Sequence, residues 1–322
     1  MDDVQLNIWA PGLSRSMDLM QRNKHEFKWF NRFLRWAQKK EIPYNPNTLI
    51  FQLMLHEIPA SLPIATLTAL ADDLPQSPAW LRADPIGLQI DLAHVYQLGN
   101  QHLFLSNPEI VELHELINPL LKNYSLSLEV PNASRFYMAC NKQPRIITHN
   151  PEEIIGKSII DYLPHGEEAD FWLRLFTEIQ MLLHHSAFNQ RRIQENKPTV
   201  DALWFWGVGE LPKKTFSSPY AMVFSDEPLV TGLAKALHFP YQCLSDNLTE
   251  VLSTLKIGEN YLIATQQFSQ LEHAEKSPQE IQQKFFYPLV QALREKKITK
   301  FLLYPGDKHC YHVATKFHWK FW

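Results

Sequence analysis

The densest group of side chains that could carry chemistry lies near the carboxyl end of the chain. It consists of Asp307, His309, Cys310 and His312. A cysteine beside histidines can be a thiolate nucleophile with a lowered pKa, or it can ligate zinc together with its neighbours. A structural zinc site needs a fourth ligand and a paired spacing that this segment does not display. A polar turn leading into a strand explains the same residues, so a catalytic, a metal-binding and a structural interpretation all stay open.

A second group with chemical potential lies in the motif AFNQRR, in the middle of the chain. Asn189, Arg191 and Arg192 belong to this motif, and the fork of a guanidinium group suits recognition of a phosphate or a carboxylate. The alternative is that the arginines form surface ion pairs with Glu195 or Glu178. The motif therefore predicts either a site for an anionic ligand or a solvated helix face.

Two glycines follow an aromatic segment in the sequence LWFWGVGELP. Gly207 and Gly209 would let a loop turn back at the carboxyl end of a strand, where open α/β sheets bind their ligands. Arg82 and Asp84, near another predicted strand, would either line the same crevice or pair with each other. We therefore count Arg82, Gly207 and Gly209 among the candidate ligand-binding residues.

Secondary structure must position these residues, and after Leu163 strand and helix signals alternate. Strands are expected over 202–206, 220–224 and 260–265, with helices over 171–182 and 226–237 and a further helix opened by the capping box Ser277–Glu280. Such alternation buries both sheet faces and favours a mostly parallel α/β sheet. The last segment, YHVATKFHWKFW, would form an antiparallel strand at an edge, or an exposed aromatic patch for a partner.

The first half of the chain predicts a different organisation. A short strand ends at Pro11-Gly12, and helices are expected over 27–37, 47–56 and 62–71. Strand character from Trp80 to Leu98 is interrupted at Asp84-Pro85, a capping box at Ser106 opens a helix, and a hairpin turns at Pro131-Asn132. We therefore predict a core formed by residues 1–84 and 165–322, with a small inserted α+β unit over 85–164.

Composition restricts the class of protein. A chain of 322 residues can bury one large core, or a core and a small subdomain, without disulfides or metals. The net charge of -3 comes without a stripe of lysine and arginine, which argues against a nucleic-acid partner. No stretch approaches about eighteen uninterrupted apolar residues, and acidic Asp2 and Asp3 stand at the amino terminus, which argues against membrane insertion and export. Three widely spaced cysteines indicate reduced thiols, and we expect a cytoplasmic protein.

The block from residue 187 to 212, AFNQRR followed by LWFWGVGELP, resembles a segment of the archaeal-type cofactor-independent phosphoglycerate mutases. Weaker similarities follow the same order in the segments TLTALAD, WLRADP and LVTGLAKALHF. The whole chain is also similar to bacterial phosphoglycerate-mutase-like proteins of regulatory or uncharacterised role. The resemblance implies an alkaline-phosphatase-like α/β fold, with a doubly wound, mostly parallel sheet and helices on both faces.

The resemblance also implies where a two-metal site would lie. The superfamily mechanism uses two divalent metals held by carboxylates and histidines, with a serine or threonine nucleophile between them. Where the family has Asp-Gly after the first strand, this chain has Pro11-Gly12, and proline has no side-chain oxygen. After the strand at 260–265 only Glu272 and His273 remain as ligands, and one glutamate beside one histidine does not hold two metals.

Two further positions depart from the family pattern. An Asp-His pair is replaced by Pro305-Gly306, so that Asp307 and His309 are displaced into the following turn. The arginine that the family has before the first glycine of its RGaG motif is Trp206 here, which exchanges a cationic phosphate contact for a flat apolar surface. Most of the metal apparatus that the resemblance implies is therefore replaced.

We expect a phosphoglycerate-mutase-like pseudoenzyme: a non-catalytic binding or regulatory module that has a degenerate two-metal site and needs no cofactor. Its ligand would be an anionic small molecule or a protein. The alternative is an active metal-dependent phosphoglycerate mutase or phosphatase with a rearranged site and Mn or Zn as cofactor. In that case the catalytic candidates are Asp307, His309 and Cys310, and the metal candidates are Glu272, His273, His309 and His312.

Overall fold

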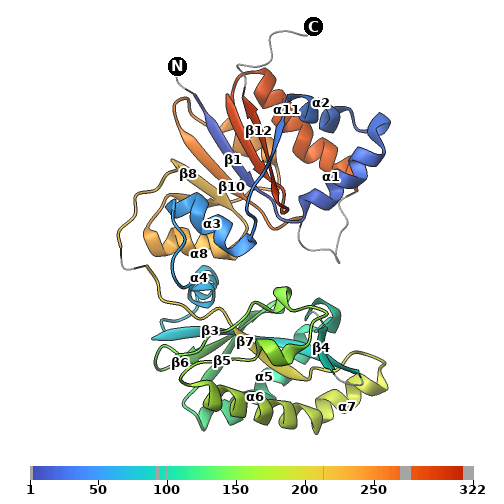
Figure 1. The fold of residues 1–322 in the computed structure, drawn as a ribbon, viewed down its shortest axis with the longest axis vertical. Coiled ribbons are helices and arrows are strands. Elements are labelled where there is room, and N and C mark those ends of the chain that lie inside the picture. The colour runs from blue at the N-terminus through green and yellow to red at the C-terminus, as the bar shows by residue number, and fades with distance from the viewer. Residues whose placement is uncertain (1–2, 92–93, 99, 213, 269–276, 315–322) are drawn as a thin grey trace. The chain divides into compact units, whose positions relative to one another are not determined.

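The computed structural model describes residues 3–91, 94–98, 100–212, 214–268 and 277–314. Its contacts divide the chain into two compact units, which we call the first unit and the second unit. The first unit is formed by Met1–Pro59 and Lys213–Trp322, and the second by Ala60–Pro212. Each unit has its own sheet and its own helices (Figure 1).

The first unit contains a seven-stranded sheet in the order β2-β12-β11-β1-β10-β8-β9. Its strands are β1 (Gln5–Trp9), β2 (Gln38–Glu41), β8 (Met222–Ser225), β9 (Tyr241–Cys243), β10 (Asn260–Ala264), β11 (Lys300–Tyr304) and β12 (His309–Ala314). The five strands from β11 to β9 in this order run parallel, while β12 and β2 are antiparallel to their neighbours. The mostly parallel sheet expected from the sequence is confirmed. The last described strand is antiparallel as expected, but β2 pairs with it and forms the edge, and 315–322 lie outside the described residues.

Helices cover both faces of this sheet (Figure 1). On one face lie α1 (Leu13–Arg22), the short helix η1 (Lys24–Glu26), α2 (Lys28–Trp36), α9 (Leu248–Ser253), α10 (Pro278–Ile281), the π-helical segment η5 (Gln282–Phe286) and α11 (Tyr287–Arg294). On the other face lie α3 (Pro46–Leu55) and α8 (Pro228–Leu237). Because both faces are covered, both sets of alternating side chains on β1 are buried. Leu6 and Ile8 pack in the core under α1 and α11, while Asn7 and Trp9 are buried on the opposite face.

The second unit contains an antiparallel sheet in which β4, β3, β6 and β5 are neighbours and β7 also pairs with β3. Its elements are α4 (Ile64–Ala71), β3 (Ala79–Asp91), β4 (His94–Leu98), η2 (Asn100–Leu103), α5 (Asn107–Lys122), β5 (Ser127–Asn132), β6 (Arg135–Cys140), η3 (Pro151–Glu153), η4 (Ile159–Tyr162), α6 (Ala169–His184), α7 (Ala187–Gln194) and β7 (Ala202–Trp206). The capping box at Ser106 and the hairpin of β5 and β6 are confirmed. The unit is α+β, as expected for the inserted part.

The boundaries of this unit differ from the expected 85–164. The strand β7 was expected in the parallel sheet, but it pairs antiparallel with β3, with Ala202 opposite Ile86 and Trp206 opposite Arg82. Aromatic contacts from α6 to β7, such as Trp172 on Phe205 with ring centroids 5.3 Å apart, tie the preceding helix to the same sheet. The whole segment up to Pro212 therefore belongs to the second unit, because its apolar residues find their partners there.

The expected interruption at Asp84-Pro85 is also absent, since β3 runs through it. Residues 79–82 pair with β6, 82–86 with β7 and 87–91 with β4. Around Pro85 the strand pairs with β7 alone among the described strands, so one side of the strand carries no ladder there. A proline is tolerated at such a position because no neighbouring strand there depends on a hydrogen bond from its N–H.

Candidate functional site at the carboxyl edge of the parallel sheet

The carboxyl ends of β1, β8, β10 and β11 meet at one edge of the first unit's sheet, where open α/β sheets place functional groups. Asp226 directly follows β8, and Thr265 directly follows β10. The Thr265 hydroxyl donates to Asp226 Oδ2 at 3.0 Å, and the Gln266 backbone N–H donates to Asp226 Oδ1 at 2.9 Å. Each oxygen of this carboxylate thus accepts one hydrogen bond from a neutral donor and keeps a second lone pair.

Asp226 is not among the candidate residues that the sequence suggests. The available signal was its position one residue beyond a predicted strand, at the same edge as the residues after β10. What the sequence could not show is that β8 and β10 are neighbours, with Ser225 opposite Ala264. That register brings the two strand ends together.

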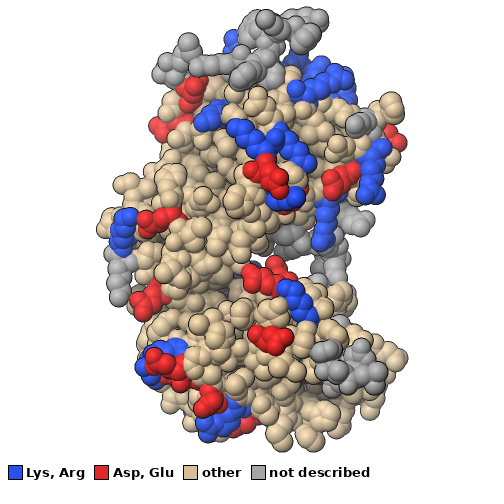
Figure 2. Space-filling view, in the orientation of Figure 1, with Lys and Arg blue, Asp and Glu red and all other residues tan. Residues whose placement is uncertain are grey.

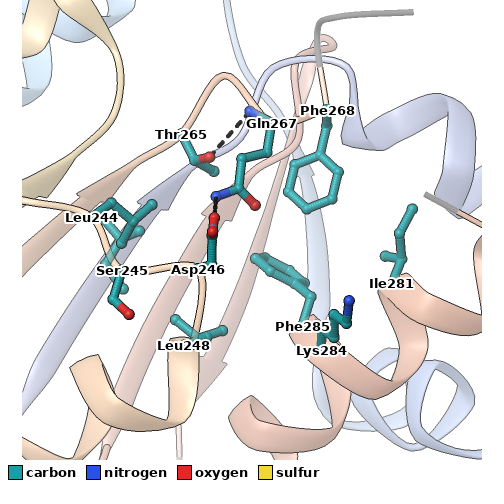
Figure 3. Close-up of a pocket in the computed structure, with 11 residues that line it drawn as sticks. Leu244, Ser245, Asp246, Leu248, Thr265, Gln267, Phe268, Ile281, Lys284 and Phe285 are labelled. Atoms are coloured by element: carbon teal, nitrogen blue, oxygen red, sulfur yellow. Dashed lines mark hydrogen bonds between the residues drawn. The ribbon is translucent and has the colours of Figure 1, made fainter. Parts of the chain in front are cut away.

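A small pocket lies beside these residues, between the end of β10 and the helices α9 and α10 (Figure 3). It encloses about 450 Å³, which includes the solvent at its mouth. Its polar lining includes Asp246, Gln267 and Lys284, and its apolar lining includes Leu248, Phe268 and Phe285. Gln267 Nε2 donates to Asp246 Oδ1 at 3.4 Å, and the Gln267 backbone N–H donates to Thr265 Oγ1 at 3.2 Å. No pocket was expected at this place from the sequence.

The loops after β1 and β11 pack directly on each other at the same edge. Backbone N–H groups of Ala10 and Ser14 donate to the carbonyls of Tyr304 and Pro305 at 2.9 and 3.0 Å. Gly12 and Gly306 both have positive φ, 87° and 95°. A Cβ added to Gly306 would lie 2.5 Å from the backbone N of Gly12. Main chain therefore fills the gap between the two loops, and no side chain could reach into it from Gly306.

The Asp307 group near the carboxyl end forms a turn rather than one convergent cluster. The backbone N–H of His309 donates to Asp307 Oδ1 at 2.9 Å, and His309 Nδ1 lies 3.1 Å from Asp307 Oδ2. Side chains alternate along β12, so Cys310 and His312 lie on one face and His309 lies on the other. The strand thus separates residues that are adjacent in the sequence.

The surroundings of Cys310 and His312 do not favour thiolate or cation chemistry. Burial raises the pKa of the Cys310 thiol to about 11, the opposite of the lowered pKa of a thiolate nucleophile. Burial also lowers the pKa of His312, with help from the charges of Lys40 and Lys300. Those two lysines would repel a metal cation at the imidazole.

Within the described residues, no group of three or more histidine, cysteine, aspartate or glutamate side chains is arranged to hold a metal ion. Glu272 and His273 lie outside the described residues. Of the ligand positions implied by the resemblance, those after β1 and β11 lie within the described residues. Pro11, Pro305 and Gly306 stand there, and none of them has a side-chain oxygen or nitrogen.

In the second unit, Arg82 and Asp84 pair with each other, the second of the two expected alternatives. Arg82 Nη2 lies 2.7 Å from Asp84 Oδ1, and both side chains are buried. Trp206 Nε1 donates to Asp84 Oδ2 at 2.6 Å, and the Arg82 guanidinium lies 5.1 Å from the Trp206 ring centroid. Trp206, at the position where the resemblance implies an arginine, therefore packs against the Arg82 cation and donates to its carboxylate partner.

Asn189 and Arg192 form hydrogen bonds from α7 to neighbouring segments of the second unit. Asn189 Nδ2 donates to the carbonyls of Leu183 and Val200, and its Oδ1 accepts from the Val200 N–H at 3.0 Å. Arg192 has no exposed surface; it pairs with Glu109 and donates to the carbonyls of Leu103 and Pro198. The polar atoms expected to bind an anion are thus bonded within the unit.

Arg191 differs from its neighbour because it is exposed. Its guanidinium pairs with the exposed Glu112 of α5, not with the Glu195 or Glu178 proposed from the sequence. The partner differs because α5 packs beside α7, a contact between segments far apart in the chain.

Gly207 and Gly209 serve a close approach between β7 and the start of α4. The Gly207 carbonyl accepts from the Ala65 N–H at 2.9 Å, and Gly207 has a positive φ of 77°. A Cβ on Gly209 would lie 2.6 Å from the backbone N of Pro63. Since β7 is antiparallel in the second unit, these glycines are not at the carboxyl edge of the parallel sheet, where the sequence analysis expected them.

Comparison with known proteins relates parts of the chain to one enzyme family. No family model matches the chain. It is 42% identical over 65 residues to the 2,3-bisphosphoglycerate-independent phosphoglycerate mutase of Methanosarcina barkeri, which covers 20% of this chain and 16% of that enzyme. It is 32% identical over 87 residues to a probable enzyme of the same name from Geobacter sulfurreducens, covering 26% of this chain and 22% of the relative. The matched segments thus span less than a quarter of either relative.

Solved structures resemble nearly the whole chain. The PH0037 protein of Pyrococcus horikoshii matches with a TM-score of 0.55 and 12% identity, over 97% of this chain and 87% of that one. The cofactor-independent phosphoglycerate mutase of Thermoplasma acidophilum matches with a TM-score of 0.49 and 12% identity, over 97% and 89% of the two chains. The expected similarity to cofactor-independent phosphoglycerate mutases is thus confirmed over part of the chain, and the α/β fold as a whole is like that of the PH0037 protein.

Proposed function

We propose that the chain is a phosphoglycerate-mutase-like protein with a degenerate two-metal site, acting as a non-catalytic binding or regulatory module in the cytoplasm. The observation that carries this proposal is the contact between the loops after β1 and β11. Gly12 and Gly306 pack main chain on main chain at the edge where the resemblance implies metal ligands. At Pro11, Pro305 and Gly306, where the resemblance implies ligands, no side-chain oxygen or nitrogen is present, so a cation pair would lack attachment points at these positions.

The state of Asp226 supports the same conclusion. Its oxygens accept one hydrogen bond each, from Thr265 and Gln266, so Asp226 offers only its remaining lone pairs. A divalent ion needs several such side chains, and within the described residues no group of three or more is arranged to hold one. The edge is better suited to holding neutral or organic groups than to concentrating divalent metal.

A second candidate function rests on the contact of Asp307 with His309. A carboxylate that orients an imidazole is a common arrangement for general base catalysis and for metal ligation. In this alternative the protein is an active metal-dependent phosphoglycerate mutase or phosphatase with a rearranged site, in which Glu272 contributes a further ligand. Mn or Zn would then be required.

Measurements of metal content and of turnover distinguish the two proposed functions. The full chain is purified, its metal content is measured, and hydrolysis of p-nitrophenyl phosphate and isomerisation of 3-phosphoglycerate are assayed with Mn²⁺ in excess. We expect no stoichiometric metal and no metal-dependent turnover. Bound metal near one or two ions per chain, with turnover that disappears in Asp307→Asn but not in the exposed control Asp18→Asn, would overturn the proposal and establish the alternative.

The proposed partner is a small molecule or a protein, without a role for nucleic acid or membrane. On the face shown in Figure 2, lysine and arginine are interspersed with aspartate and glutamate, and the net charge is -3. No helix in the described parts of the chain is both long enough and apolar enough to cross a bilayer. The anionic ligand expected from the sequence would need groups other than Arg82, Asn189 and Arg192, because these are bonded within their unit.

A further inference from the structure

The face of the first unit's sheet opposite α1 and α11 carries a row of polar side chains. Opposite residues of paired strands share a face, so the register places Asn7, Leu302, His312 and Gln38 in one row across β1, β11, β12 and β2. Sheets with helices on both faces usually present apolar residues on both. Here Asn7 is buried, His312 is half-buried and Gln38 is exposed. The row is therefore polar and becomes open to solvent toward β2.

Two lysines flank this row diagonally on the same face. Lys40 lies opposite Cys310, the next residue on that face before His312, and Lys300 lies opposite Ala314, the next one after it. Diagonal neighbours are about 7 to 8 Å apart, a distance that long side chains span. Burial lowers the pKa of His312, and the charges of Lys40 and Lys300 lower it further. Both ammonium groups are thus close enough to act on the imidazole.

No carboxylate offsets these two charges among the described strand residues of this face. Within the described residues neither Lys40 nor Lys300 forms an ion pair. The one acidic residue of β2, Glu41, lies on the opposite face and pairs with Lys308. Lys39 also lies on that opposite face, 5.8 Å from the ring centroid of Tyr311. The basic residues of β2 and its neighbours are therefore partnered on one face and unpartnered on the other.

The same row contains polar atoms whose hydrogen bonding is incomplete. His312 Nε2 is buried and has no hydrogen-bond partner in the part of the chain that the structure describes. Asn7 is 4% exposed, and its side-chain bond there is a long one, from Nδ2 to the Tyr261 carbonyl at 3.5 Å. Most buried polar side chains in native proteins have better partners, so such a row requires a functional explanation.

We propose that this face binds a small doubly charged oxyanion between Lys40 and Lys300, against the exposed part of the His312 ring. Ammonium groups without a counter-charge favour an anion, and their contacts with oxyanions are charge-assisted hydrogen bonds. Two positive charges attract a dianion more strongly than a monocarboxylate. Two lysines are too few for the basic stripe that a nucleic acid requires. The inference rests on the proposed function, because it gives the expected anionic ligand a site that the buried arginines of the second unit do not provide.

The test is a calorimetric titration of the metal-free full chain with sulfate at low ionic strength, where surface charges are least screened. We expect saturable binding that weakens by about fivefold or more in Lys40→Gln and in Lys300→Gln, because each loses one charge-assisted contact. Lys39→Gln is the matched control. It removes the same charge from the adjacent residue of β2, on the opposite face, and should leave the affinity nearly unchanged.

The titration of His312 provides a second readout, which a merely structural role of the lysines would not change. A dianion between Lys40 and Lys300 offsets their repulsion of the imidazolium, so saturating sulfate should raise the pKa of His312 compared with sodium chloride at equal ionic strength. Proton NMR of the histidine rings measures this pKa, and His312→Gln assigns the signal. In Lys40→Gln the effect of sulfate should be smaller.

Four results would overturn the inference: no saturable sulfate binding, equal weakening in Lys39→Gln and Lys40→Gln, acetate binding as tightly as sulfate, and a pKa of His312 that sulfate leaves unchanged. Circular dichroism shows whether each variant is folded. If Lys300→Gln is not, the comparison of Lys39→Gln with Lys40→Gln decides, since both lysines are exposed. Failure of the proposed function would instead appear as bound metal and metal-dependent turnover, which are separate measurements.

Discussion

Gly306 and Gly12 lie back to back at the edge of the sheet, so close that a Cβ on Gly306 would lie 2.5 Å from the backbone N of Gly12. Each glycine follows a proline that comes soon after a parallel strand, and both have positive φ. In a related phosphotransfer enzyme this edge is expected to carry metal ligands. Here it carries a main-chain contact, and the consequences can be measured.

Gly306→Ala should destabilise the first unit strongly. The added methyl group meets the Gly12 and Pro11 backbone, and alanine at a φ of 95° is strained. We expect a loss of more than about 2 kcal/mol in the free energy of unfolding. Gly258→Ala is the matched control: Gly258 has a φ of 85° with nothing within 4 Å, so it should lose only about 1 to 2 kcal/mol. Equal losses in urea denaturation would contradict the packing argument.

Arg192→Met should cost far more stability than Arg191→Met, although the residues are neighbours. Removing Arg192 leaves the buried carboxylate of Glu109 with only the half-exposed Lys197, 3.6 Å away, and breaking a buried pair costs about 3 to 5 kcal/mol. Arg191 forms an exposed pair with Glu112, so its loss should hardly change the melting temperature. If Arg192→Met melted like Arg191→Met, Arg192 would not have the structural role assigned to it.

The Glu109 carboxyl should make stability depend on acid pH. Burial opposes ionisation, but hydrogen bonds from Ser106 and the charge of Arg192 outweigh it and lower the pKa to about 2, from an ordinary 4.5. A depressed folded-state pKa contributes stability that is complete above the unfolded value and is lost as pH falls from 4.5 toward 2. Acid denaturation followed by circular dichroism should therefore show a shallower pH dependence in Glu109→Gln, which is less stable at neutral pH. An unchanged slope would contradict the assignment.

The three thiols should differ in reactivity. Cys243 is exposed on β9, whereas burial raises the pKa of Cys310 to about 11 and that of Cys140 to about 12. At about pH 8 we expect one rapidly alkylated cysteine per folded chain, because the thiolate is the reactive form. Mass spectrometry after a short iodoacetamide pulse should find the label on Cys243, and Cys243→Ser should abolish the rapid phase. Rapid labelling of Cys310 would revive its interpretation as an activated nucleophile.

Sequence reasoning predicted most elements because their signals are local. Residues only a few positions apart specify the capping boxes at Ser106 and Ser277, the strand over 202–206 and the hairpin at Pro131-Asn132. All of these elements are confirmed. The partner of β7 was not predictable in this way. An apolar strand of five residues can enter a parallel or an antiparallel sheet, and its pairing with β3 depends on residues more than a hundred positions away.

The sequence alone determined that proline and glycine, rather than residues with metal-binding side chains, follow β1 and β11. The lack of a side-chain oxygen or nitrogen at a position can be recognised without coordinates. The sequence also shows that part of the chain resembles phosphoglycerate mutases. Only the tertiary structure decided that Arg82 pairs with Asp84 and Trp206, that Arg192 is buried against Glu109, and that Asp226 accepts from Thr265 and Gln266. The reason is physical: an arginine has the same chemistry whether it faces a ligand or a carboxylate of its own chain, and long-range packing alone selects between them.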